Sequence, residues 1–181
     1  MKLSLIIISA IVGIALISLC CVMSSKNGAI SLEESVNAAK SGIDVQLSNR
    51  FNKLNELAEC VKKYDAHEHQ TILEVITARG KNMSASQAKE CIAAFSRVEE
   101  RYPELKSQAN YNQLMTEISL TENHLAQAKR SFNEFVRDYN RYVRKFPTSS
   151  FLALTGYEVV SFEYYEAESY TKDDKPLPLF N

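Results

Sequence analysis

Histidine and carboxylate side chains occur together at His67-Glu68-His69, which makes this stretch the first candidate for metal or acid–base chemistry. Two residues that lie two positions apart on a helix point about 200° away from each other, so the two imidazoles cannot bind one ion from one helix. The H-E-x-x-H pattern is absent and His124 is distant in sequence. We therefore interpret His67 or His69 as a capping or surface histidine beside a turn.

Nucleophilic and cofactor chemistry have no motif in the sequence, because G-x-S-x-G, P-loop, G-x-G-x-x-G and C-x-x-C patterns are all absent. Cys60 and Cys91 could form a disulfide in an oxidising compartment, but we favour their interpretation as small apolar core residues. The sequence therefore predicts a protein that is not an enzyme, with no catalytic, cofactor-binding or metal-binding residues. It also predicts no cofactor and no small-molecule substrate.

The elements that must position these side chains are helices, and the clearest one lies between Pro103 and Pro147. Within it, side chains that are apolar or aromatic recur every seven residues, at Tyr111, Ile118, Leu125, Phe132, Tyr139 and Phe146. A second row follows three residues later, at Leu114, Thr121, Ala128, Phe135 and Tyr142. This spacing predicts a helix of roughly 43 residues with one buried seam, ended by the two prolines.

Two asparagines, Asn133 and Asn140, follow seam aromatics at the same interval of seven residues. A buried amide of this kind can fix the register of packed helices. The same side chains could equally face solvent, so both interpretations stay open.

Another long helix is predicted from Ser31, whose hydroxyl can cap a first turn that contains Glu33 and Glu34. From Val36 to Val61 the apolar positions advance by close to 3.6 residues, as on an amphipathic helix.

Two shorter helices are expected between these long ones. Asp65, three residues before Glu68, resembles a capping box and predicts a turn, and Gly80 is placed to end the helix that follows. Ser84 or Ser86 can cap the next helix, over residues 85–101. The predicted fold class is all-α: an N-terminal transmembrane helix followed by an antiparallel up-and-down four-helix bundle with one long C-terminal bundle helix.

The run Leu3–Met23 carries no charge and is long enough to cross a bilayer, since about 20 helical residues suffice. We interpret it as a membrane anchor, with residues 3–23 in the membrane. A cleaved signal peptide is the alternative, but the run exceeds the usual apolar length and no A-x-A pattern precedes Ser24. Cys20 or Cys21 could carry a lipid, although Leu19 stands where a small residue is expected.

The expected domains are the anchor at 1–23, a polar linker at 24–30, a helical bundle at 31–163 and an extended tail at 164–181. Aromatic residues crowd the end of the bundle, at Phe162, Tyr164, Tyr165 and Tyr170. They predict a cover over the core, with a docking surface as the alternative. Without residues 1–23 the formal charge is −2, from 20 basic and 22 acidic side chains. We therefore expect no nucleic-acid partner.

The chain resembles the LemA family in an ordered set of short pieces between about residues 43 and 163. The matching pieces are Ile43-Asp44-Val45-Gln46-Leu47, Tyr64 with His67-Glu68, Tyr102-Pro103-Glu104-Leu105-Lys106, Thr121-Glu122-Asn123, Phe132-Asn133, Val136, Tyr139-Asn140, Phe146-Pro147, Gly156 and Phe162. The chain departs from the family pattern at Asn55, where a proline is common, and at Arg50, which remains from a basic pair.

The resemblance implies a bacterial, membrane-anchored helical bundle without an established activity. We predict an interaction or scaffolding module of the cell envelope, with the membrane and an unidentified protein as partners. One alternative is a membrane-linked enzyme or enzyme accessory that uses His67 and Glu68. Another is a purely structural envelope protein without a stable partner. Basic residues near the apolar run are too few to predict which side of the membrane holds the bundle.

Overall fold

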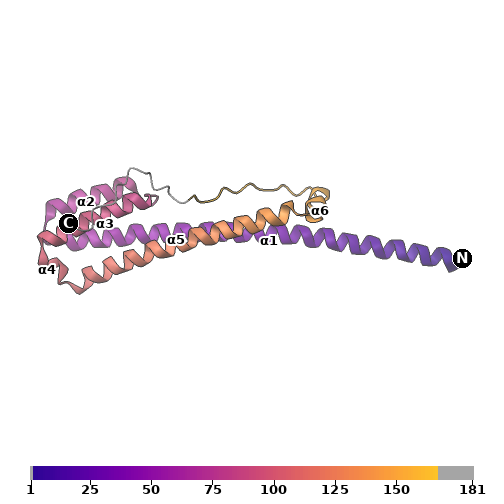
Figure 1. The fold of residues 1–181 in the computed structure, drawn as a ribbon, viewed down its shortest axis with the longest axis horizontal. Coiled ribbons are helices and arrows are strands. Elements are labelled where there is room, and N and C mark those ends of the chain that lie inside the picture. Colours follow the sequence, from indigo (N-terminus) through magenta and orange to yellow (C-terminus); the bar gives the residue numbers. More distant parts are fainter. Residues whose placement is uncertain (1, 167–181) are drawn as a thin grey trace, which may run out of the picture. The chain divides into compact units, whose positions relative to one another are not determined.

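The computed structural model describes residues 2–166, and it contains helices, turns and one extended segment but no strand within that range (Figure 1). The predicted all-α class is therefore confirmed. Met1 and residues 167–181, which include Tyr170 and most of the predicted tail, lie outside the described part. The helices are α1 (Lys2–Val61), α2 (Ala66–Arg79), α3 (Ala85–Arg101), α4 (Pro103–Lys106), α5 (Ala109–Arg144) and α6 (Thr148–Leu154).

The described residues divide into two compact units. The first unit comprises residues 2–41 and 129–164, and the second unit comprises residues 42–128 with residues 165 and 166. Helices α1 and α5 contribute to both units, because the divisions fall inside these two helices.

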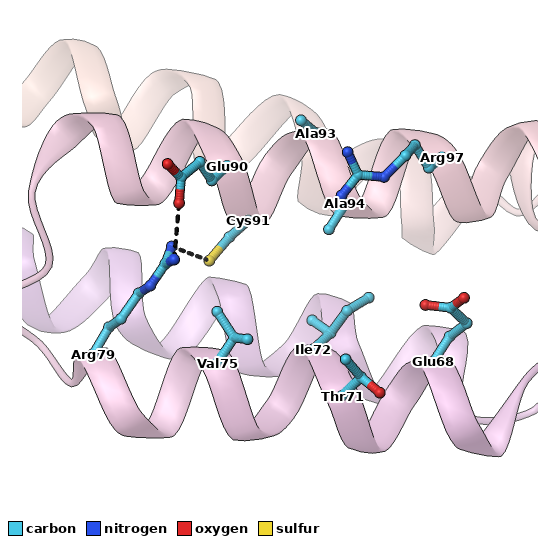
Figure 2. Close-up of a pocket in the computed structure, with 10 residues that line it drawn as sticks. All are labelled: Glu68, Thr71, Ile72, Val75, Arg79, Glu90, Cys91, Ala93, Ala94 and Arg97. Atoms are coloured by element: carbon cyan, nitrogen blue, oxygen red, sulfur yellow. Dashed lines mark hydrogen bonds and ion pairs between the residues drawn. The ribbon is translucent and has the colours of Figure 1, made fainter.

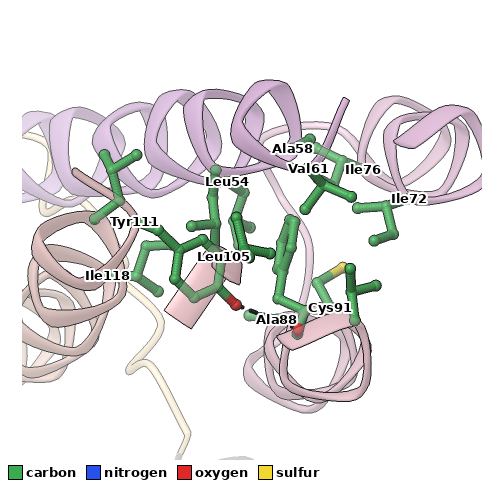
Figure 3. Packing of buried hydrophobic residues seen from close by; sticks show 14 of the residues in the cluster. Leu54, Ala58, Val61, Ile72, Ile76, Ala88, Cys91, Leu105, Tyr111 and Ile118 are labelled. Atoms are coloured by element: carbon green, nitrogen blue, oxygen red, sulfur yellow. Dashed lines mark hydrogen bonds between the residues drawn. The ribbon is translucent and has the colours of Figure 1, made fainter. Parts of the chain in front are cut away.

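The second unit is built around an apolar core to which α1, α2, α3, α4 and α5 all contribute (Figure 3). The core side chains are Leu54, Leu57, Ala58, Val61, Ile72, Ile76, Met83, Ala88, Cys91, Phe95, Val98, Leu105, Tyr111, Leu114 and Ile118. The one hydroxyl among them is satisfied, since Tyr111 donates a hydrogen bond to the Phe95 carbonyl at 3.2 Å. Removal of these side chains from water is the main term that stabilises this unit.

The ends of α2 and α3 are capped as predicted. Asp65 Oδ1 accepts hydrogen bonds from the backbone N–H groups of His67 and Glu68, each at 3.0 Å. Gly80 ends α2 with a φ of 64°, a conformation that residues with a Cβ rarely adopt. Ser84 caps α3 in a reciprocal capping box with Gln87.

The predicted helix start at Ser31 is wrong, because α1 runs without a break through residues 24–30, the expected linker. Ala29 is fully buried and extends the apolar pattern to a point before Ser31. Gly28 is also helical, and a Cβ there would lie 2.8 Å from Cζ of Tyr142. Gly28 and Ala29 are therefore packing positions of a continuous helix.

The predicted start of the long helix near Pro103 is also wrong. Pro103 begins the short helix α4, and α5 begins only at Ala109. Leu105 and Tyr111 are both fully buried, yet residues six apart on one helix point about 120° away from each other. The break at Ser107 and Gln108 lets both side chains enter the same core.

The predicted seam on α5 is confirmed from Tyr111 to Tyr139 in its first row, but it is wrong at two aromatics. Phe135 is 39% exposed and Phe146 is 78% exposed, whereas Val136 and Val143 are buried. An α-helix has 3.6 residues per turn, so a strict spacing of seven drifts by about 20° per heptad. The buried face therefore moves by one residue near Phe132.

Candidate functional site

The histidines proposed for metal or acid–base chemistry do not meet at one site. His67 is exposed, whereas His69 is buried and its Nε2 lies 3.0 Å from Oε1 of Glu59. That hydrogen bond, with Lys62 nearby, lowers the pKa of Glu59. Glu68 is held by Arg101 at 2.8 Å. Among the described residues, no group of three His, Cys, Asp or Glu side chains is placed to hold a metal ion.

The cysteines of the second unit are free thiols with environments unlike those of a nucleophile. Cys91 is buried in the core, and Cys60 packs against the core. Burial raises the pKa of both thiols. A nucleophilic cysteine needs its pKa lowered, so both thiols fit their predicted role as core residues.

A concave surface of the second unit lies between α2 and α3, and we call it the α2–α3 groove (Figure 2). Its volume is about 400 Å³, and it is lined by Glu68, Thr71, Ile72, Val75, Arg79, Glu90, Cys91, Ala93, Ala94 and Arg97. The lining has apolar side chains in its middle and charged side chains at both ends. This composition is typical of a surface that receives another amphipathic element.

Charges at one end of the groove are fully paired. Arg79 binds Glu90 at 2.8 Å and the Gln87 carbonyl at 3.0 Å, and its guanidinium also approaches Cys91 Sγ at 3.9 Å. These contacts join the last turn of α2 to α3 and fix that end of the groove.

The other end of the groove carries a cation without a partner. Glu68 is already bound to Arg101, whereas the exposed Arg97 makes no ion pair or hydrogen bond with any residue of the described chain. Figure 2 shows Arg97 extended along α3 beside Ala94, on the side of the groove opposite Glu68. Sequence analysis missed this groove, because its lining is assembled from two helices whose relative placement no motif reveals.

The second feature that sequence analysis missed is a buried arginine on α1. Arg50 is 1% exposed and occupies a position seven residues after the buried Ile43 and seven before the buried Leu57. Its Nη1 donates to Glu122 Oε1 at 3.2 Å, and its Nη2 donates to the Met83 carbonyl. Its Nε–H has no partner among the described residues.

The contacts of Arg50 give it an architectural role. They connect α1 to the loop between α2 and α3 through Met83 and to α5 through Glu122. The spacing of seven residues was the sequence signal that could have located it, since a charged residue in an apolar row must be paired.

The family model for the LemA family matches residues 39–177, which include Arg50, the α2–α3 groove and all of α5. The chain belongs to the LemA family. None of the curated proteins matches this LemA-family chain.

The first unit of this LemA-family protein contains a network of tyrosine hydroxyls. Residues 157–162 come after α6 in the chain and are extended, and we call them the C-terminal strap. The strap lies against α5, where it contacts Tyr139. The Tyr157 hydroxyl donates to Glu33 at 2.5 Å and lies 3.2 Å from the Tyr139 hydroxyl. The backbone N–H of Val160 donates to Tyr139 Oη at 3.0 Å, and the Phe162 ring packs edge-on against Tyr139 at 5.2 Å. These contacts favour the cover interpretation for Phe162, while Tyr164 stays 49% exposed.

Burial raises the pKa of Tyr157, and its hydrogen bonds to Glu33 and Tyr139 raise it further. The phenol therefore stays protonated at neutral pH and acts as a donor. This arrangement holds the C-terminal strap on α1 and α5.

Proposed function

We propose that this LemA-family chain is a single-pass membrane protein of the bacterial cell envelope, and that its helical bundle is an interaction or scaffolding module. The anchor is supported by the start of α1, the one helix of the described residues long and apolar enough to cross a membrane. Its side chains are exposed in every direction, for example Leu5 at 64%, Ile11 at 60% and Ile17 at 66%. Such a surface is unfavourable in water and suits a lipid environment.

We further propose that α1, α2, α3 and α5 form an antiparallel up-and-down four-helix bundle. The shared core of the second unit supports this arrangement, because all four helices bury side chains in it. In this proposal the bundle supplies a rigid frame for the groove between two of its helices.

The single observation that carries the interaction role is the α2–α3 groove. Its partner would be an amphipathic protein segment with apolar side chains that pack on Ile72 and Val75. A carboxylate on the same segment would pair with Arg97, the cation that lacks a partner among the described residues. Pairing and apolar burial together would give specificity as well as affinity.

The test is photo-crosslinking in intact cells with the complete chain. A photoreactive phenylalanine analogue placed at Val75 should capture a discrete protein, whereas the same group at Thr116, on the exposed side of α5, should not. Arg97→Glu should reduce the yield of this product several-fold. Lys81→Glu changes charge equally outside the groove and should leave the yield unchanged. Equal products from Val75 and Thr116 would refute the role of the groove.

We also propose that the chain is not itself an enzyme. Support comes from the raised pKa of both thiols in the second unit and from the engagement of His69 with Glu59. A membrane-linked enzyme accessory and a structural envelope protein remain the alternative functions. The crosslinking experiment separates them, since a structural protein without a stable partner should yield no discrete product.

A further inference from the structure

An exposed apolar and basic surface lies where α5 ends and α6 begins, inside the first unit. Phe146 is 78% exposed and Leu154 is 77% exposed, although both are large apolar side chains. Exposed large apolar side chains at one end of a helical unit are suited to contact with a lipid surface.

The level of the turn along α1 is fixed by direct contacts. The Tyr142 hydroxyl donates to the Ser25 carbonyl at 3.3 Å, and the Tyr142 ring fills the space above Gly28. Ser25 comes only two residues after the end of the apolar run at residues 3–23. The last turn of α5 therefore lies beside the first turn of α1 that follows the proposed anchor.

Phe146 lies closer still to the anchor. Within the first unit α5 runs antiparallel to α1, and α6 stands beside α1 where the N-terminal part of α1 continues alone (Figure 1). The last residue of α5, Arg144, is two residues beyond Tyr142, which corresponds to roughly 3 Å at a helical rise of 1.5 Å per residue, and Phe146 follows it in the turn. The same displacement along α1 from Ser25 leads to Met23, the last residue of the apolar run.

The charge of this turn also matches a lipid surface. Residues 139–157 contain Arg141, Arg144 and Lys145 but no acidic residue. These three side chains are exposed, and none forms an ion pair with any described residue. Cationic side chains at the edge of an apolar surface are attracted to anionic headgroups.

We propose that the turn between α5 and α6 is a second membrane contact, in which Phe146 and Leu154 enter the boundary between headgroups and acyl chains of an anionic bilayer. Arg141, Arg144 and Lys145 bind the headgroups around them. The bilayer is the same one that holds α1, so this inference rests on the proposed anchor. The result is a domain held at the membrane by two points instead of one.

The chain contains no tryptophan, so one introduced indole reports a single position. We would prepare three full-length variants, Ile14→Trp, Phe146→Trp and Phe135→Trp, and reconstitute each in vesicles of phosphatidylglycerol and phosphatidylcholine with brominated or ordinary acyl chains. Phe135 is the matched control, because it is an exposed aromatic of α5 that lies about 14 Å before the last residue of that helix.

Brominated lipid should quench the emission of Ile14→Trp and Phe146→Trp by about half or more, since interfacial apolar groups lie within roughly 5–10 Å of the acyl boundary. The emission of Phe135→Trp should be unaffected. Pure phosphatidylcholine, or the added pair Arg144→Gln and Lys145→Gln, should weaken quenching at position 146 and leave position 14 unchanged.

The three positions separate the possible failures. Quenching at position 14 without quenching at position 146 would refute the second contact and leave the anchor intact. No quenching at position 14 would refute the anchor and this inference together. A blue-shifted emission at position 146 that brominated lipid does not quench would show that protein, such as a second copy of the chain, covers the turn instead of lipid.

Discussion

The two units of this protein are stabilised in different ways. The second unit, residues 42–128, buries apolar side chains from every one of its helices and one ion-paired arginine. The first unit joins stretches of α1 and α5 to α6 and the C-terminal strap, and hydroxyls of Tyr139, Tyr142 and Tyr157 make its long-range contacts. The first unit also buries apolar side chains, such as Val36, Val136 and Leu152, but fewer of them than the second unit, so directional hydrogen bonds and close contact contribute more to its stability.

The largest expected effect comes from the buried charge of the second unit. Arg50→Ala should destabilise the protein by about 3–5 kcal/mol, because it leaves Glu122 without its partner and opens a cavity. Urea unfolding in detergent micelles, followed by far-UV circular dichroism, measures this loss. The double variant Arg50→Met with Glu122→Gln should recover most of it. Failure of that recovery would show that the ion pair itself stabilises this unit.

Glycine substitutions should have opposite signs in the two units. Gly28→Ala should cost about 1–3 kcal/mol, because the new methyl group would lie 2.8 Å from Tyr142 Cζ. Gly42→Ala has no atom within 4 Å of the new methyl group and should stabilise α1 by up to about 1 kcal/mol. Thermal unfolding of both variants tests the contrast. Equal shifts would show that the tight contact in the first unit is unimportant.

Removal of one buried hydroxyl from each unit sharpens the comparison. Tyr111→Phe should lower global stability by about 1 kcal/mol through loss of the bond to Phe95. Tyr139→Phe should instead release the C-terminal strap locally, because Val160 N–H loses its acceptor. Amide exchange at Val160 should accelerate about tenfold, while exchange in α3 stays unchanged. Global destabilisation by Tyr139→Phe would contradict a local role.

The smallest effects concern pH. The raised pKa of Tyr157 means that the folded first unit holds this proton more tightly than the unfolded chain does. Its contribution is therefore intact below pH about 10, the ordinary tyrosine value, and decreases as pH rises above it. Limited proteolysis of the C-terminal strap across this range measures the loss. Tyr157→Phe should remove this pH dependence.

In the second unit, the contribution of a carboxylate to stability should instead be lost in acid. The backbone N–H of Glu68, with the Tyr102 hydroxyl, lowers the pKa of Asp65 against the opposing effect of desolvation. This contribution is present above the ordinary value of about 3.9 and is lost as pH falls through the lowered pKa. Asp65→Asn keeps the cap, so the protection of amides at the start of α2, taken relative to their intrinsic exchange rate at each pH, should become independent of pH there.

Local features of the fold were predictable from the sequence. Asp65, Gly80 and Ser84 act as predicted because capping depends on residues within one helical turn. The first row of the α5 seam was correct as far as Tyr139 because helical periodicity is also local. The exposure of Phe146 was missed because it follows the end of α5 at Arg144, where helical periodicity no longer applies.

Features that depend on distant parts of the chain were not predictable in the same way. The groove requires the register of α2 against α3, and the partner of Tyr157 is Glu33, 124 residues away. Arg50 was taken for part of a family pattern, since arginine is usually exposed and only its place in a row of sevens indicated burial. The continuous course of α1 through Ser25 and Gly28 became evident only with Tyr142 in place.

The absence of a side chain at Gly28 also sets where α5 contacts α1. A side chain at position 28 would collide with the Tyr142 ring, so glycine there allows α1 and α5 to approach this closely. The position of the turn at Phe146 along α1, relative to the end of the apolar run, therefore depends on the contact between Gly28 and Tyr142. Residues added to or removed from α1 between the apolar run and Gly28 would therefore change the distance of that turn from the membrane.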